Sequence, residues 1–167
     1  MLKSLMGSLF GTDPTEGWPP HSGNAPVFDL EMLGVGSMRL GGPLEGARAL
    51  GKPTRCRVPT KGAAILEYDG VGMDLTFHDG KLMCVAFTTA TDTDRPGRSE
   101  PTVGGYKIRA ATTPDEVLAW FGEPTSDGSS TDGSLRWIEF RRGSATLEFE
   151  FDEEQLSFVQ IYTEGYA

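Results

Sequence analysis

The chain has 167 residues, of which 38% are hydrophobic and 10% aromatic, a composition typical of folded globular proteins and not of fully disordered ones. Fifteen lysines and arginines stand against 24 aspartates and glutamates, which gives a formal net charge of −9. A charge of this sign opposes binding to nucleic-acid phosphates or anionic lipids, and it favours either simple solubility or a basic protein partner.

Residues 1–26 are expected to form an N-terminal extension that becomes rich in proline and glycine toward its end. No signal-peptide pattern is present, and no run approaches the roughly 18 apolar residues that a membrane-spanning helix requires. We therefore expect a cytoplasmic protein without a membrane span. Cys56 and Cys84 lie in no paired motif, so neither a disulfide framework nor a zinc site is indicated.

Residues 27–88 are predicted to form a first repeat unit. Its segment 43–51 has the pattern of a two-turn helix, with a proline in the first turn, Gly51 at the end and Pro53 just beyond. A polar loop at 54–62 follows, and three alternating segments at 64–68, 73–78 and 82–88 predict short strands. Asp-Gly turns between them are typical of hairpins, so these strands should form an antiparallel sheet.

Residues 89–105 are predicted to be a polar linker or loop, and residues 106–167 a second repeat unit. Segment 114–122 repeats the helix pattern of 43–51, and a polar loop at 125–134 follows it. Alternating segments at 136–140, 147–152 and 156–163 predict three more strands. The fold class expected is therefore α+β: two tandem units, each a helix plus an antiparallel three-stranded sheet, forming a larger curved sheet with helices on one face.

Alternation along the strands separates a helix-covered face from an open face. In the second unit the open face combines aromatic rings with carboxylates, a mixture typical of protein-binding surfaces because the rings bury large areas and the carboxylates attract a basic partner. Alternatively, these rings pack against the other unit or the N-terminal segment. The residues predicted to bind a partner are Trp137, Glu139, Glu148, Glu150, Phe158, Gln160, Tyr162, Asp74 and His78.

Motifs for catalysis or cofactor binding are weak. The two histidines, His21 and His78, lie far apart and show no metal-ligand spacing, and no complete dinucleotide or phosphate loop occurs. Glu148 and Glu150 lie about 7 Å apart on one side of a strand, a separation that paired carboxylates use in glycoside hydrolysis, but no recognisable pocket accompanies them. We expect no cofactor, no metal site and no catalytic residue.

The succession of helix, Leu/Phe-Gly-x-Pro, polar loop and three strands, written twice, resembles the beta-lactamase inhibitory protein. The single unit is similar to small lipoprotein components of the outer-membrane assembly machinery. The most specific element is the helix that ends Phe121-Gly122-Glu123-Pro124 before the strand Leu147–Phe151. The resemblance implies a protein that is not an enzyme and that clamps a target on a concave sheet formed by both repeats. It implies a binding mode and not a particular target.

The function predicted from these observations is that of a non-catalytic bacterial binding protein. It would act as an immunity protein or inhibitor that occludes another protein, for instance a basic toxin or enzyme. One alternative is a structural or assembly component of a secretion or envelope system. Another is a small-molecule-binding domain or a hydrolase, which a deep apolar pocket would favour.

Overall fold

The computed structural model describes residues 13–89 and 100–166, of which strands make up 46% and helices 12%. The α+β class predicted from the sequence is therefore wrong, and the protein is mostly β, with two sheets. The first twelve residues of the predicted extension and most of the predicted linker lie outside the described residues. The division into two units stays a prediction.

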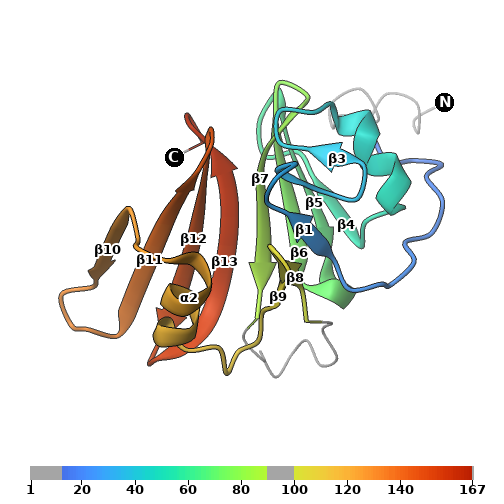
Figure 1. The fold of residues 1–167 in the computed structure, drawn as a ribbon. Helices are drawn as coiled ribbons and strands as arrows, with labels where there is room; N and C mark the ends of the chain where they lie inside the picture. Colours follow the sequence, from blue (N-terminus) through green and yellow to red (C-terminus); the bar gives the residue numbers. More distant parts are fainter. Residues whose placement is uncertain (1–12, 90–99, 167) are drawn as a thin grey trace, which may run out of the picture.

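The larger sheet has eight strands in the order β10-β11-β12-β13-β7-β6-β5-β4 and is antiparallel throughout (Figure 1). The six strands predicted from alternation are confirmed to within two residues at either end. Two short edge strands, β4 and β10, lie inside the segments predicted to be polar loops. The bounds are β4 Arg55–Arg57, β5 Ala63–Tyr68, β6 Met73–His78, β7 Lys81–Thr88, β10 Ser126–Ser129, β11 Leu135–Arg142, β12 Ala145–Asp152 and β13 Gln155–Thr163.

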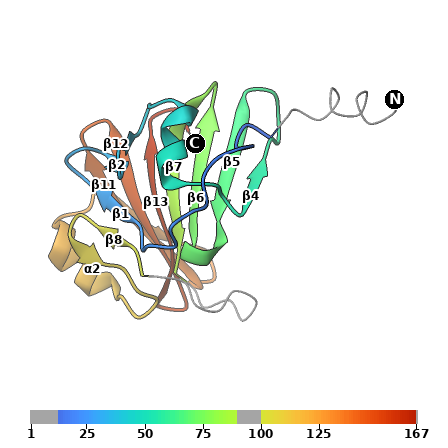
Figure 2. The same cartoon turned by 90° about the vertical axis from the view of Figure 1, so that its right-hand side faces the viewer.

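The smaller sheet has five strands in the order β3-β2-β1-β8-β9. Its bounds are β1 Val27–Asp29, β2 Gly34–Val35, β3 Met38–Arg39, β8 Thr102–Val103 and β9 Tyr106–Lys107. Strands β1 and β8 pair in parallel, and β8 falls within the segment predicted to be a linker. Figure 2 shows this small sheet in front of the large one, where a layer of helix alone was expected. This second sheet is the main reason for the change of fold class.

The helical elements are short. The helix predicted at 114–122 is confirmed as α2 (Pro114–Phe121), whereas 43–51 forms a 3-10 helix, η1 (Leu44–Leu50), and a second 3-10 turn, η2, spans Asp69–Val71. Thr113 and Glu116 close a capping box at the start of α2, while η1 has no side-chain cap and contains Gly46, which weakens a helix. None of the helices in the described residues is long and apolar enough to span a bilayer.

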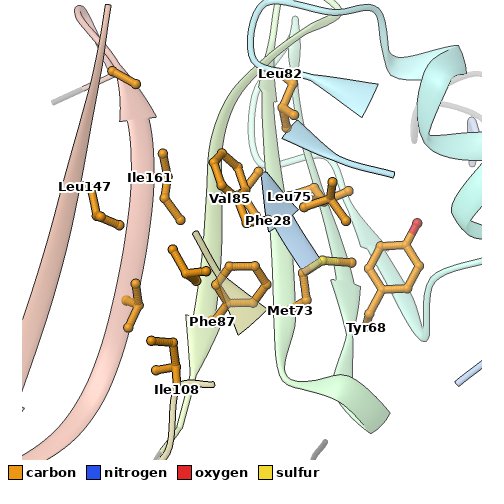
Figure 3. Close-up of a cluster of buried hydrophobic side chains, with 14 of the residues drawn as sticks. Phe28, Tyr68, Met73, Leu75, Leu82, Val85, Phe87, Ile108, Leu147 and Ile161 are labelled. Carbon is orange, nitrogen blue, oxygen red and sulfur yellow. The ribbon is translucent and has the colours of Figure 1, made fainter. Parts of the chain in front are cut away.

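The core lies between the large sheet and the layer that covers it. Phe28 of β1 is fully buried and lies against the large sheet beside Leu75 and Val85 (Figure 3). At the other end of the sheet, the Phe121 ring of α2 is 5.3 Å from the ring of Phe149 and 5.5 Å from that of Phe140. Because alternation places all these sheet residues on one side, α2 and the small sheet cover the same face, and we call the opposite face the open face.

Candidate functional site on the open face of the large sheet

A row of polar side chains crosses the open face from strand to strand. Strand register places Glu139 of β11 opposite Glu148 of β12, and Glu148 opposite Gln160 of β13. The Gln160 amide Nε2 donates a hydrogen bond to Glu148 Oε1 at 3.0 Å, and the Tyr162 hydroxyl donates to Glu148 Oε2 at 3.1 Å. Both oxygens of Glu148 are thus held by neighbours on β13, which fixes the position of this carboxylate.

Glu150 adds a further carboxyl group beside this row. It is partly buried and lies opposite Trp137 on one side and Phe158 on the other. Burial and the neighbouring Glu148 raise the pKa of Glu150 to about 7. The pKa of Glu139 is raised by the same two causes, and burial likewise raises that of Tyr162, so the Tyr162 hydroxyl remains a donor. These three glutamates form the group that we call the carboxylate cluster.

The carboxylate cluster has no ion-pair partner among the described residues. Arg141, two residues after Glu139 on the same face of β11, pairs with Glu164. None of the ion pairs among the described residues involves Glu139, Glu148 or Glu150. The other end of the same face differs, because Arg55 Nε lies 2.8 Å from Glu67 Oε2 and Arg57 pairs with the same carboxylate. One end of the open face is therefore neutralised within the chain, and the other end keeps excess negative charge that an external cation would relieve.

The predicted aromatic residues differ in their surroundings. Trp137 is partly buried and lies opposite Gly128 of the edge strand β10, so close that a Cβ atom at position 128 would lie 2.4 Å from the indole. The indole therefore covers the backbone of β10. Phe158 and Tyr162 of β13 are partly buried on the open face, on either side of Gln160 along the strand.

The remaining predicted residues lie farther away. Asp74 of β6 is in the same row as the cluster, since it lies opposite Ala86, which in turn lies opposite Gln160. His78 is exposed at the end of β6, where its Nδ1 is 3.4 Å from Asp79 Oδ2. Four residues of strand, or about 13 Å, separate it from Asp74. The structure thus brings seven of the nine predicted residues together on β11–β13, places Asp74 beside them and leaves His78 apart.

Tyr166, near the C-terminus, belongs to this face and was not predicted. Its ring lies 5.8 Å from that of Tyr162, and burial raises the pKa of its hydroxyl. Beneath it on β7, Cys84 is only 1% exposed, and burial raises the pKa of the thiol to about 12. A thiol that stays protonated is a poor nucleophile. No periodic signal marks Tyr166, because it follows β13 after a turn and a glycine.

No group of three or more histidines, cysteines, aspartates or glutamates within the described ranges could hold a metal ion. No protein-family model matches the chain, and no curated protein matches it. A solved structure that resembles it is that of a DUF4309 family protein, YjgB, from Bacillus subtilis. The two share 12% identity over 72% of this chain and 76% of that chain, with a TM-score of 0.46. A likeness this weak carries no argument about fold or function, and the resemblance to the beta-lactamase inhibitory protein stays a prediction.

Proposed function

We infer that this chain is a non-catalytic binding protein that occludes a basic partner protein, in the manner of an immunity protein or inhibitor. The contact surface is the β11–β13 half of the open face. The observation that carries this inference is the carboxylate cluster, which is partly buried, has no ion-pair partner among the described residues and lies between Trp137, Phe158 and Tyr162.

Electrostatics supports a cationic side chain of the partner as the group that enters the cluster. Glu139 and Glu148 face each other across neighbouring strands, an arrangement that destabilises a sheet when both carry charge. A lysine or arginine placed among them would remove this repulsion and pair with the charged carboxylates. The chain keeps the repulsion in the free state, as expected of a binding surface whose complement is supplied by another molecule.

The side chains around the cluster suit a protein contact. Tyr162 presents a large ring whose hydroxyl is already committed to Glu148, so little side-chain freedom remains to be lost on binding. Tyrosine and tryptophan are also the residues most often found at energetic centres of interfaces. A partner can therefore bury an aromatic surface and insert a cation at the same place.

The first test recovers partners from the source organism with the purified chain as bait. The bait variants are Trp137→Ala and Tyr162→Ala, and the matched control is Tyr106→Ala, which removes an exposed ring from the small sheet on the other side of the molecule. We expect a basic partner that the wild type and Tyr106→Ala retain and the other two variants lose. A partner retained equally by all four baits would exclude the proposed surface.

The second test uses that purified partner in binding kinetics. Trp137→Ala and Tyr162→Ala should each weaken the complex by at least about 2 kcal/mol at both low and high salt. Glu148→Gln and Glu150→Gln should also weaken the complex, and they should in addition slow association and reduce its salt dependence, because these carboxylates both pair with the partner's cation and attract it from a distance. Because the cation binds the ionised form of Glu150, affinity should rise as the pH rises through about 7. Affinity independent of pH would count against the cluster as the cation site.

The identity of the partner also distinguishes an inhibitor or immunity protein from the alternative, an assembly component of a secretion or envelope system. A toxin or enzyme whose activity falls on binding supports an inhibitor or immunity protein. A membrane or secretion component whose activity does not change supports an assembly role.

A further inference from the structure

A pocket of about 320 Å³ lies on the small-sheet side of the molecule, away from the carboxylate cluster. The segment 19–27 forms one wall, and the end of η1 forms another through Ala49, Leu50 and Gly51. Two further lining residues, Val35 and Met73, belong to the buried core. The volume falls at the lower end of the range of about 300 to 1,000 Å³ that small-molecule sites occupy, and most of the lining is apolar.

The walls of this pocket are held in place by the chain on both sides. Upstream of the wall, Thr15 and Trp18 are buried, at 0% and 6% exposure. The backbone N–H of Lys52 donates to the carbonyl of Pro19 at 2.6 Å, which ties the wall to the end of η1. Gly51 has φ +89°, and a Cβ atom there would lie 2.6 Å from the Pro20 carbonyl oxygen. The two backbones therefore meet at a glycine, which fixes the side of the pocket formed by segment 19–21 and the end of η1.

His21 supplies a polar group that no described residue satisfies. Its Nδ1 lies 2.6 Å from the carbonyl oxygen of Leu50. A carbonyl oxygen can only accept, so Nδ1 carries the hydrogen, and in the neutral ring Nε2 is then an acceptor with a free lone pair. Nε2 is buried and has no hydrogen-bond partner within residues 13–89 and 100–166. A buried acceptor without a donor is uncommon in folded proteins and marks a place where a donor is missing.

We propose that this pocket binds a small, mostly apolar organic molecule whose hydroxyl group donates a hydrogen bond to Nε2 of His21. The aliphatic lining contacts the apolar part of the ligand, and the hydroxyl donates to the lone pair of Nε2 that no described residue satisfies. Nε2 is buried, so the ligand reaches it by displacing the exposed segment 22–25, where Gly23 has open space around it. This site is independent of the protein-binding surface proposed above.

Phenol and its methyl ether, anisole, form a matched pair of probes because they share a ring and differ in the hydroxyl donor. Proton–nitrogen correlation spectra of the full chain, recorded during titration with each compound, report where and how tightly they bind. Phenol should shift the amide signals of Gly36 and Gly51, which line the pocket, and should bind at least about tenfold more tightly than anisole. Equal affinities for the two, or no shifts at these amides, would overturn the proposal.

Two variants and one spectroscopic signal distinguish a specific hydrogen bond to His21 from nonspecific binding of an apolar compound. His21→Asn keeps a donor for the Leu50 carbonyl but lacks Nε2, so its affinity for phenol should fall to that of anisole. Ala49→Leu adds bulk at an exposed lining position and should weaken both compounds. In the wild type, the Nε2 nitrogen resonance should move with phenol and not with anisole. If the chemical shift of the His21 Nε2 nitrogen does not change on titration with phenol, the hydrogen bond is refuted, even if His21→Asn does not fold.

Discussion

Replacing Glu150 with glutamine should stabilise the protein at pH 8 and leave its stability nearly unchanged at pH 4.5. The folded state raises the pKa of Glu150 from its ordinary value of 4.5 to about 7. Between these values the folded protein holds a proton that the unfolded chain releases, so this carboxyl stabilises the fold below pH 4.5 and loses that contribution as the pH rises through about 7. Glutamine has nearly the same shape and no charge, so it removes the penalty.

The size of the effect follows from the pKa and from exposure. A change of one pKa unit corresponds to about 1.4 kcal/mol, which would give about 3 kcal/mol for a fully shielded group. Glu150 is only partly buried, and solvent screening reduces the expected gain to about 1 kcal/mol at pH 8. Urea unfolding at both pH values measures it, with Asp152→Asn, an exposed position on the same face of β12, as control. A gain of equal size at both pH values, or none at pH 8, would refute the electrostatic reasoning.

The other predictions concern packing. Phe149→Ala should lower the free energy of unfolding by about 3 to 5 kcal/mol, because the ring is fully buried against Phe121. The neighbouring Glu148→Ala should change it by about 0.5 kcal/mol or less. Similar melting temperatures for the two variants would contradict the assignment of faces. Gly51→Ala and Gly122→Ala both place alanine at positive φ, of +89° and +83°, at a cost of about 1 to 3 kcal/mol. Only position 51 adds a clash, so Gly51→Ala should be clearly the worse in denaturant titrations, and equal losses would show that segment 19–21 does not pack there.

Strands with a clear period of two could be predicted from the sequence, and strands without it could not. Met73–His78 of β6 was predicted with its observed bounds because its side chains alternate between core and open face over six residues. By contrast, β1, β2, β3, β8 and β9 are two or three residues long, too short to show any period. These strands form by pairing with segments distant in the chain, as β8 pairs with β1, and the local sequence cannot predict such pairing.

The two predicted helices also show how far a local sequence pattern can predict structure. Both have a proline at the start and a glycine at the end, yet only α2 is an α-helix. The difference lies in Thr113 and Glu116, whose reciprocal hydrogen bonds satisfy free backbone donors in the first turn. On the open face, alternation predicted which residues share a side. It could not reveal that Arg55 and Arg57 neutralise Glu67, because segment 54–62 has the composition of a loop.

The pairing of β7 with β13 at the middle of the large sheet has a consequence for how the chain folds during synthesis. Strands β4 to β7 leave the ribosome well before β13. Until β13 is synthesised, the backbone groups of β7 at this edge remain unpaired, next to the apolar side chains of Val85 and Phe87. Such an edge can pair with another nascent chain, which makes the partly synthesised protein prone to aggregation. Closing the sheet joins segments some 75 residues apart, and pairings over such separations form slowly. A chain that stops before β13 would keep this edge open, and we expect it to aggregate rather than persist as an isolated half.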